Sequence, residues 1–470
     1  MTTLKLYDRL TNEVSEVATR DPGVLTAYVC GPTVYARIHV GNARPYWFGL
    51  VLKRFCEQRL GLRVRLACNI TDINDSIYVA ATSLGVPSAT LAREMTDAYI
   101  ADTGALGLGR PDVEPLATET IPEIITLIER LIAAGAAYAV DGDVYFRVEA
   151  FPSYGLLSGQ RTDELVAGAR VEPDERKRSP LDFALWKATK PDEDTSWPSP
   201  WGEGRPGWHI ECSAMAELHL GLGFDVHGGG LDLVFPHHEN ERAQTEACGS
   251  GVLARRLLHN GMLRLQGAKM SKSTGNVERL HEALDRLAGP ETLLVFFAGA
   301  HYRSPVDYSE EVLGQAQRAA EGLRNTIRNA RRALAAAPTG SDPTLRELAV
   351  ATGVTFDERM ADDLDSPRAL AAVHGLAGAI NTAVSSPNPD PVGLRDAIET
   401  LVSLLDVLGL ATLGGEPEVP AEILELAEAR ELARGRRDFA ESDRLRDEIA
   451  QRGFAVRDTP AGPQVVPADA

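Results

Sequence analysis

The alternation of strand-like and helix-like patterns between residues 25 and 75 constrains the fold more than any other feature of the sequence. LTAYVCG (25–31) is a short, β-rich apolar run that Gly31-Pro32 ends. Residues 43–61 then place apolar side chains three and four positions apart, as on one face of a helix, and RVRLACNITDIND (63–75) returns to strand character. A strand, a helix and a second strand in this order predict a βαβ unit with parallel strands.

Polar side chains follow both strands of this unit. In open parallel sheets, ligands bind beyond the carboxyl ends of the strands. Cys30 ends the first strand, Asp72 follows the second, and His39 lies in the connecting loop. The sequence therefore predicts a ligand site at this edge of the sheet.

The region from about 112 to 200 is predicted to interrupt the sheet as an insertion. Residues 120–138 have a strong helical pattern, and DGDVYFRV (141–148) has the form of a hairpin. The sheet pattern resumes with FDVHGGGLDLVFPHHENE (224–241). The insertion is therefore bracketed by two halves of one α/β domain.

The chain beyond residue 305 has a different character. Nearly every segment there is an amphipathic helix, and the breaks are rich in glycine, proline and serine, at 337–344, 385–393 and 414–420. This pattern predicts a helical bundle followed by a small C-terminal module.

The composition argues against a membrane or secreted protein. No apolar run approaches the ~18–20 residues that span a bilayer, and the N-terminal segment lacks the apolar core of a signal peptide. The five cysteines are odd in number and widely scattered, which argues against a disulfide framework and favours reduced thiols or a metal site. We therefore expect a cytoplasmic protein.

The formal charge of −19 limits how the chain can bind nucleic acid. An acidic protein repels phosphate on average, so only a local basic patch can bind RNA. The densest arginine run lies in 428–462 and includes Arg430, Arg434, Arg436 and Arg437. These side chains could contact phosphate; the alternative is a solvated helix face on which arginines pair with glutamates.

The first motif with chemical potential is PTVYARIHVGN (32–42), between the first strand and the helix. Glycine permits close approach of the backbone, and a helix N-terminus favours anionic phosphate. His39 and Asn42 could add donors for charge that develops on a phosphoryl oxygen. The alternative is a turn with a surface histidine.

The second motif is GAKMSKSTGN (267–276). Lys269 and Lys272 are flanked by small and hydroxyl residues, so they would form a cationic loop able to clamp a triphosphate. The alternative is an exposed basic turn.

Together the two motifs resemble the signatures of class I aminoacyl-tRNA synthetases. HVGN (39–42) stands where that family has His-Ile-Gly-His, and KMSKS (269–273) matches in full. The resemblance implies a Rossmann-type sheet that binds ATP, with Mg²⁺ accompanying the nucleotide, and attack of an amino-acid carboxylate on the α-phosphate. It implies catalytic roles for His39, Asn42, Lys269 and Lys272, and contacts to ATP from Gly41, Gly229, Gly230 and Lys272.

Thiol, imidazole and carboxylate groups that could bind a metal are spread over three segments. Zinc prefers thiolate and imidazole ligands. The candidates are Cys30, Cys212 and the cluster PHHENER (236–242). If that cluster opens a helix, His237 and Glu241 stand one turn apart on one face and His238 points elsewhere. Because there is no CxxC pair, buried structural cysteines remain the alternative at this point.

Five segments resemble the cysteinyl-tRNA synthetases specifically: CGPTVYARIHVGNARP, NITDIND, GWHIECSAM, GGGLDLVFPHHENERAQTEA and HNGMLRLQGAKMSKSTGN, in this order. The resemblance implies one zinc ion per chain, held by Cys30, Cys212, His237 and Glu241. Zinc would accept the thiolate of L-cysteine, whereas the hydroxyl of serine is a poor ligand at neutral pH. It also implies that Thr71, Trp208 and Asp232 bind the amino acid. His209 and Glu211, on either side of Cys212, could orient the ligands.

The resemblance covers nearly the whole chain and implies cysteine tRNA, L-cysteine and ATP as partners of a protein that we expect to be monomeric. The predicted fold is α/β, with an α+β insertion, an α-helical bundle and a small C-terminal module. The predicted limits are 1–114 and 204–250 for the halves of the Rossmann domain, 115–203 for the insertion, 251–305 for a stem-contact region with the KMSKS loop, 306–413 for the anticodon-binding bundle and 414–470 for a tRNA-binding module.

Two residues depart from the family pattern, and the sequence allows two other functional interpretations. The family commonly has aspartate at Asn74 and lysine at Ser76, so no family role is transferred to either residue. A cysteine ligase that passes activated cysteine to a sugar amine would share the catalytic half, but it would lack the region after 305. A non-catalytic paralogue that only binds RNA or metal is disfavoured by the intact motifs.

Overall fold

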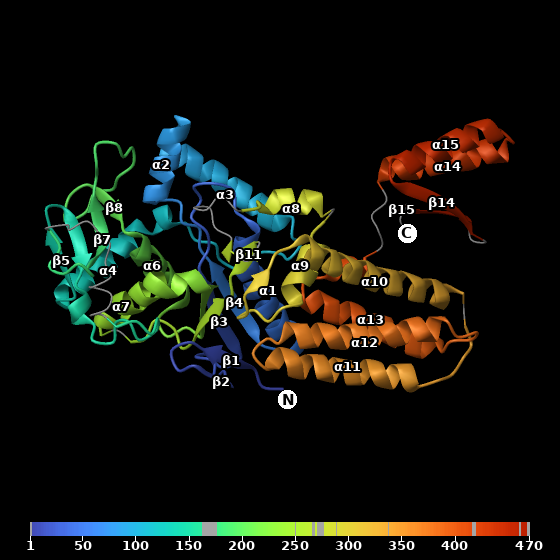
Figure 1. Cartoon of the computed structure of the whole chain (residues 1–470), viewed down its shortest axis with the longest axis horizontal. Helices are drawn as coiled ribbons and strands as arrows, with labels where there is room; N and C mark the ends of the chain where they lie inside the picture. Colours follow the sequence, from blue (N-terminus) through green and yellow to red (C-terminus); the bar gives the residue numbers. More distant parts are fainter. Residues whose placement is uncertain are drawn as a thin grey trace.

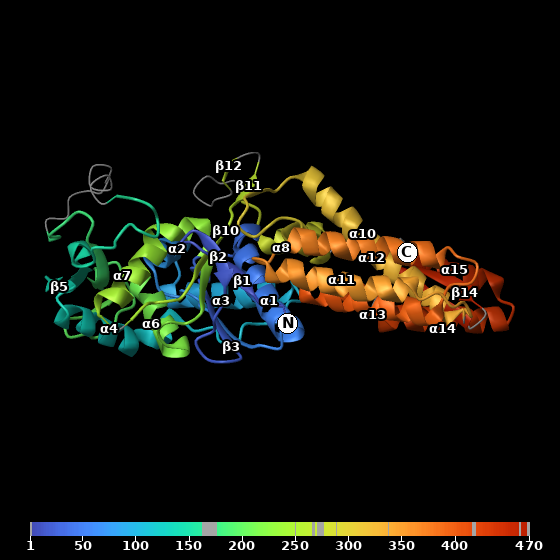
Figure 2. The ribbon, with the colours of Figure 1, turned by 90° about the horizontal axis from the view of Figure 1, so that it is seen from below.

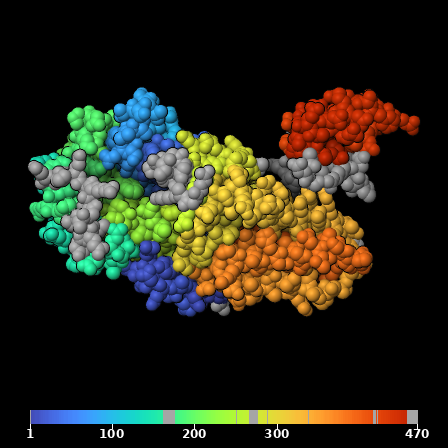
Figure 3. Space-filling view, viewed as in Figure 1, coloured from blue at the N-terminus to red at the C-terminus, as the bar shows by residue number. Residues whose placement is uncertain are grey.

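The computed structural model describes residues 2–161, 176–249, 251–265, 268–269, 277–287, 289–336, 338–415, 420–459 and 462–467, with the backbone alone at 268–269, 421, 457–459, 462–464 and 466–467. Within these ranges the molecule is elongated: an α/β body lies at one end, a helical bundle at the other, and a C-terminal module stands apart from the bundle (Figure 1, Figure 3). None of the described helices is long and apolar enough to cross a membrane.

A parallel sheet forms the centre of the α/β body. In the described part of the chain its strands run in the order β10, β9, β3, β4, and each neighbouring pair is parallel. The strands and the helices around them are β3 (Val24–Val29), α1 (Val40–Arg59), β4 (Arg63–Cys68), α6 (Trp208–Leu220), β9 (Val226–Gly230), α7 (Glu239–Ala247) and β10 (Leu257–Asn260). The predicted βαβ unit is confirmed as β3, α1 and β4, and the predicted α/β fold class is confirmed with it.

Helices cover both faces of this sheet. Successive side chains of a strand point to opposite faces, so side chains of β3 pack against helices on both sides. Leu25 and Val29 of β3 are buried in the cluster that contains the α1 side chains. Tyr28 and Cys30 are buried instead with Met215 of α6. The faces are therefore occupied by helices, and the carboxyl edge of the sheet is left for ligands.

The insertion forms a second sheet, and its strands are antiparallel. Its elements are α4 (Ile121–Ala133), β5 (Ala137–Val140), β6 (Asp143–Phe146), β7 (Phe183–Ala188) and β8 (Gly204–Pro206). The predicted hairpin is confirmed as β5 and β6. Because β8 pairs with β7, the insertion sheet extends just past the predicted limit at residue 203.

The remaining elements of the α/β body connect these two sheets and the bundle. They are β1 (Lys5–Asp8), β2 (Glu13–Glu16), α2 (Asp75–Leu84), α3 (Ser88–Gly104), the short helical turns at Ala117–Thr120, Val148–Ala150, Leu231–Leu233 and Val234–His238, β11 (Leu263–Leu265), β12 (Ala268–Lys269), α8 (Leu280–Arg286), α9 (Glu291–Ala298) and β13 (Val306–Asp307).

The predicted helical bundle is confirmed, and it shares α1 with the sheet. Its long helices run along the long axis of the molecule (Figure 2). They are α10 (Glu310–Ala335), α11 (Thr344–Ala361), α12 (Ser366–Val384) and α13 (Pro391–Val407), followed by a turn at Ala411–Gly414. On α1, the buried Trp47 indole donates to the Leu408 carbonyl at 3.1 Å, and Arg59 pairs with Asp357 at 2.7 Å. These contacts join the bundle to the helix that opens with the HVGN motif.

The C-terminal module is a helix pair packed on a hairpin. It consists of α14 (Ala421–Gly435), α15 (Phe439–Gln451), β14 (Phe454–Thr459) and β15 (Gly462–Pro467). Ile423 and Ile449 are fully buried in a small core of its own. The module therefore has its own apolar core, as the predicted small C-terminal module requires.

Candidate active site and metal centre

Three strands end together at the carboxyl edge of the central sheet. Val29, the last residue of β3, is in register with Cys68 of β4 and with Gly228 of β9. The Cys30 amide donates to the Gly228 carbonyl at 2.9 Å. Cys30 is thereby fixed directly beyond its strand, at the edge where the sequence predicted a site.

The four residues predicted as metal ligands are brought together at this edge. One ligand atom each from Cys30, Cys212, His237 and Glu241 lies within 4.8 Å of all the others, and all four residues are buried. They come from the end of β3, the first turns of α6, the turn at Val234–His238 and α7. Segments far apart in the sequence thus supply two sulfurs, a nitrogen and an oxygen to one small volume.

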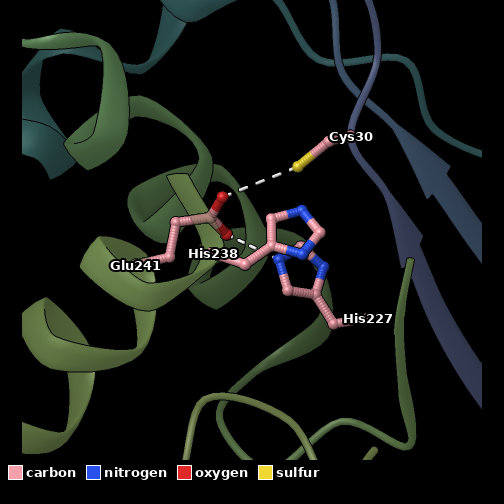
Figure 4. A group of neighbouring side chains, drawn as sticks. All are labelled: Cys30, His227, His238 and Glu241. Atoms are coloured by element: carbon pink, nitrogen blue, oxygen red, sulfur yellow. Dashed lines mark hydrogen bonds and ion pairs between the residues drawn. The ribbon is translucent and has the colours of Figure 1, made fainter. Parts of the chain in front are cut away.

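The two carboxylate oxygens of Glu241 have different neighbours. Oε1 lies 2.7 Å from Nε2 of His237 and 3.6 Å from the Cys30 sulfur. Oε2 lies 2.6 Å from Nε2 of His227 (Figure 4). One oxygen therefore faces the predicted ligand set, and the other is held by a residue outside it.

His227 and His238 were not predicted to belong to this site, and the expectation that His238 points elsewhere is wrong. With Cys30 and Glu241 they form a second group whose ligand atoms also lie within 4.8 Å of one another (Figure 4). The His238 ring lies 4.3 Å from the His227 ring, centroid to centroid. The reason is that His238 stands three positions before Glu241, and on a helix this spacing also brings side chains together.

Electrostatics divide the four predicted ligands. Burial raises the pKa of Cys30 well above its ordinary value, and Glu241 outweighs burial and raises the pKa of His237 to about 10. The other two groups, Cys212 and Glu241, are shifted toward their deprotonated forms. A hydrogen bond from Cys30, with His237 adding to it, lowers the pKa of Cys212 to about 6. Burial alone would raise the pKa of Glu241, but His227 and His237 outweigh burial and hold this pKa well below its ordinary value. Metal ligands must be deprotonated, so the shifts of Cys212 and Glu241 suit a cation site.

An aromatic side chain and a second histidine lie against His237. The Trp208 ring is 4.3 Å from the His237 ring, and Nδ1 of His209 is 2.9 Å from Nδ1 of His237. Burial holds the pKa of His209 well below its ordinary value, so its imidazole is neutral. His209 thus contacts a predicted ligand. Burial also holds the pKa of Glu211 well above its ordinary value, and this carboxyl is fully buried.

Thr71, another predicted substrate contact, lies at the same edge. Thr71 is buried and pairs with Thr33 through backbone hydrogen bonds, and its hydroxyl accepts from Nδ2 of Asn69 at 3.1 Å. Three residues further on, Asn74 caps α2 by accepting from the Ser76 amide at 3.0 Å. Asn74, which departs from the family pattern, thus has a structural role.

The predicted nucleotide contacts Gly229 and Gly230 are the last two residues of β9. Asp232 is exposed in the turn at Leu231–Leu233, and a Cβ at Gly230 would lie 2.5 Å from its carboxylate. A Cβ at Gly229 would lie 2.9 Å from Leu233 and 3.0 Å from the His238 ring. No larger residue fits at either glycine without displacing these neighbours.

The HVGN motif forms the start of α1. His39 is the N-cap, and Oδ1 of Asn42 accepts from the His39 amide at 3.2 Å. A Cβ at Gly41 would lie 2.8 Å from the His39 ring, so glycine leaves room for the imidazole there. The amide groups of the first helical turn lie next to this motif and favour bound phosphate.

The KMSKS motif is described only in part. The backbone of Lys269 belongs to β12, whereas its side chain and the whole of Lys272 lie outside the described residues. The segment that follows the motif runs beside HVGN: the Val40 amide donates to the Glu278 carbonyl at 3.0 Å, and the Leu280 amide donates to the Ile38 carbonyl at 3.0 Å. The segment that follows the KMSKS motif is therefore a neighbour of HVGN.

Both the sequence and the fold are similar to those of known proteins. Three family models match: the catalytic domain of class I (C) tRNA synthetases at 16–318, the DALR domain at 355–412 and the anticodon binding domain of cysteinyl-tRNA ligase at 416–465. The fold is similar to that of the Mycobacterium tuberculosis methionyl-tRNA synthetase in complex with methionyl-adenylate, with a TM-score of 0.58 at 20% identity over 86% of this chain and 94% of that one.

Relatives with the same organisation span nearly the whole chain. The cysteine–tRNA ligase of Shouchella clausii is 43% identical over 98% of both chains. That of Parvibaculum lavamentivorans is 45% identical over 98% of this chain and 97% of its own. Because identity at this level extends from the catalytic domain through the anticodon-binding module, the chain belongs to the cysteine–tRNA ligases, the class I aminoacyl-tRNA synthetases that charge tRNA with cysteine.

Proposed function

We propose that the chain activates L-cysteine with ATP as cysteinyl-adenylate, that zinc selects the substrate thiolate, and that the cysteinyl group then passes to the terminal adenosine of cysteine tRNA. The observation that carries the proposal is the buried convergence of Cys30, Cys212, His237 and Glu241 at the carboxyl edge of the sheet. Two thiols, an imidazole and a carboxylate are the donor types of a zinc site.

Donor chemistry favours this set over the overlapping set of Cys30, His227, His238 and Glu241, because it offers two sulfurs instead of one and zinc prefers thiolate. Nε2 of His227 is engaged by Glu241, and Nδ1 of His227 lies 3.3 Å from the Tyr28 carbonyl. With both nitrogens directed at oxygens, His227 is suited to orient Glu241 rather than to bind the metal itself. We therefore assign the metal to Cys30, Cys212, His237 and Glu241.

Zinc held there would supply a position for the sulfur of the substrate. The chain's own residues supply the rest of the selection: Trp208 closes the pocket against His237, and Thr71 and Asp232 bind the amino-acid end. Size alone distinguishes such small substrates by only ~1–3 kcal/mol. Recognition of sulfur by its chemistry therefore removes the need for an editing domain.

The phosphates of ATP are placed between the two motifs. A carboxylate oxygen of cysteine attacks the α-phosphorus, and pyrophosphate leaves with the Mg²⁺ that accompanies ATP. His39, Asn42, Lys269 and Lys272 stabilise the charge that develops on the phosphoryl oxygens. Gly41, Gly229 and Gly230 let the backbone approach the nucleotide. In the second step the 2′-hydroxyl of the tRNA attacks the carbonyl carbon, and AMP leaves.

The C-terminal module would bind tRNA through a smaller arginine set than the sequence indicated. Arg430 is buried and pairs with Glu431 at 2.8 Å, and Arg434 lies 3.4 Å from the same carboxylate. Arg436 and Arg437 are exposed at the turn between α14 and α15. Phe439, which sequence reasoning passed over, is 65% exposed beside them and offers a ring on which a base can stack.

The experiment that tests the proposal combines three measurements on one sample. Purified protein is assayed for charging of cysteine tRNA with labelled cysteine, for cysteine-dependent pyrophosphate exchange and for metal content. Charging with about one zinc per chain is the expected result. Exchange without charging would point to a ligase with another acceptor, such as a sugar amine. Absence of both activities would point to a protein that only binds RNA.

Two further parts of the proposal concern the state of the protein. We propose that it acts as a monomer, which sedimentation at working concentration would test, and that it acts in the cytoplasm. Each of the five cysteines is a free thiol, as a reducing compartment would keep them. The domain limits stated from the sequence remain predictions.

A further inference from the structure

A second cavity lies at the opposite edge of the central sheet, where β3 and β4 begin. Its volume is about 600 Å³, within the usual range of pockets for small ligands. The lining side chains come from the start of both strands, the end of α6 and two loops: Arg20, Asp21, Val24, Thr26, Arg63, Val64, Arg65, Asp112, Val113, His219 and Leu220. At a rise of ~3.3 Å per residue, β3 separates this cavity from Cys30 by about 20 Å.

The two carboxylates that line the cavity are already engaged. Asp21 accepts from Arg20 at 2.9 Å and 3.1 Å. Asp112 accepts from Lys53 at 2.9 Å with both oxygens, and from the Leu66 amide at 2.8 Å. Neither carboxylate is therefore left to neutralise another cation in the cavity.

Two other sources of negative potential near the cavity are also offset. The second arm of Arg20 donates to the Leu220 and Leu222 carbonyls, at 2.8 Å and 3.1 Å, and so covers the negative end of α6. Beneath the cavity, the buried Asp225 accepts from the Arg20 amide at 2.6 Å and from the amide and hydroxyl of Thr26 at 2.8 Å each.

Two positive groups in the cavity, Arg63 and Arg65, lack such partners among the described residues. Within the described ranges, the guanidinium groups of Arg63 and Arg65 make no hydrogen bond or ion pair, and both side chains are exposed. They occupy alternate positions of β4 and so point to the same side of the strand. His219 stands nearby: burial lowers its pKa, and the charge of Arg65 lowers it further, against a smaller opposing effect of Glu123.

We propose that this cavity is a binding site for a small phosphate-bearing ligand, held by Arg63, Arg65 and His219. Guanidinium groups form paired hydrogen bonds with phosphate oxygens, and two of them side by side match a dianion. Val24, Val113 and Leu220 supply an apolar surface for an organic group attached to the phosphate. The site is separate from the ATP site and does not depend on the proposed reaction.

The chemistry allows two sources of phosphate, free phosphate or a phosphate monoester, and both are probed on the full-length protein. Histidine labelled with ¹³C reports on the cavity, and His219→Gln identifies its resonance. The protein is titrated with inorganic phosphate, with ribose 5-phosphate and with ribose. Saturable movement of the His219 resonance by a phosphate compound, but not by ribose, is the expected result. Tighter binding of ribose 5-phosphate than of phosphate would identify the monoester as the ligand class.

A matched pair of variants tests the assignment. Arg63→Gln/Arg65→Gln is expected to weaken binding at least about tenfold, since it removes both paired donors. Arg93→Gln/Arg395→Gln removes the same charge from two exposed arginines outside the cavity and is expected to leave binding unchanged. Pyrophosphate exchange should be the same in both variants, which also shows that they fold.

Three outcomes would overturn the proposal. The first is no movement of the His219 resonance at ~10 mM of either phosphate compound, a concentration beyond weak specific binding. The second is equal binding by both double variants. The third is movement of the resonance with tRNA alone, which would make the edge a contact for the RNA backbone.

Discussion

Nε2 of His237 lies 2.7 Å from Oε1 of Glu241, one helical turn further along the chain, and both side chains are almost completely buried. The contact places an imidazole and a carboxylate side by side at the point where β3 delivers Cys30 and α6 delivers Cys212. Burial of a carboxylate is costly unless it is compensated. The compensation here comes from His227 and His237 together, and a bound cation would add to it.

Loss of a cysteine from this cluster should remove the metal. We expect Cys212→Ala to lower zinc from about one per chain to a small fraction, because a closed zinc site needs its thiolate ligands. Cysteine-dependent pyrophosphate exchange should fall with it. Elemental analysis of the purified variant measures the first effect. Cys56→Ala is the control, since Cys56 is also fully buried but belongs to α1 and packs in the main core. Full zinc content in Cys212→Ala would contradict the ligand assignment.

Removal of His227 should weaken the metal site without abolishing it. His227 holds the oxygen of Glu241 that faces away from the other ligands, so its loss frees the carboxylate to rotate. Loss of such a supporting contact typically costs ~10–100-fold in metal affinity. Competition with a chelator measures this in His227→Ala, and His227→Gln should recover part of the affinity, because its amide can still donate. His374→Ala in α12 should have no effect; unchanged affinity in His227→Ala would refute the orienting role.

Lys272 of the KMSKS motif should affect the activation of cysteine but not the binding of zinc. Lys272→Ala is expected to slow cysteine-dependent pyrophosphate exchange by ~10²-fold or more, because it removes a charge that stabilises the transition state. Zinc content should be unchanged. Lys190→Ala, an exposed lysine of the insertion, serves as the matched control. Equal exchange rates in Lys272→Ala and the parent would remove Lys272 from the catalytic set.

Asp75 should make a pH-dependent contribution to stability. Burial alone would raise the pKa of Asp75, but Lys187 and Arg205 of the insertion sheet outweigh burial and lower it to about 2. An unfolded aspartate has a pKa of ~3.9, so the contribution is complete above about pH 4 and is lost as the pH falls toward 2.

The measurement is the free energy of unfolding of Asp75→Asn and of the parent across this range. The parent should be more stable from about pH 5 to 7, and the difference should shrink between about pH 4 and 2. The exposed Asp192→Asn in the same insertion should show no such trend. A difference that grows on acidification would have the wrong sign for a lowered pKa.

The arginines at the turn of the C-terminal module should affect the binding of tRNA but not the activation of cysteine. Arg436→Gln/Arg437→Gln is expected to raise the KM for tRNA and to reduce the salt dependence of binding by about one unit of slope per lost phosphate contact. Pyrophosphate exchange should not change. Arg444→Gln/Arg446→Gln removes equal charge from arginines that are paired with Glu441 and Asp443, and its effect should be smaller. Equal effects of the two variants would mean that only the net charge of the module matters.

Local pattern was sufficient for many elements of the fold. The βαβ unit was readable because apolar spacing switches from strand-like to helical and back, and the hairpin at β5 and β6 was readable from DGDVYFRV. The role of His227 at the site could not be predicted, because its strand lacks such a pattern. Strand β9 is buried on both faces, so it has no alternation of polar and apolar residues to single out a functional histidine.

The sequence by itself determined the two signature motifs, the family and the pairing of His237 with Glu241, since each is a matter of residues adjacent or one turn apart. Only the tertiary structure decided that Cys30 meets a carboxylate 211 positions away, that His227 holds the second oxygen of that carboxylate, and that Arg205 and Lys187 bind Asp75. Such contacts depend on strand register and on how helices pack against the sheets. These properties arise from packing between distant segments, which no local pattern contains.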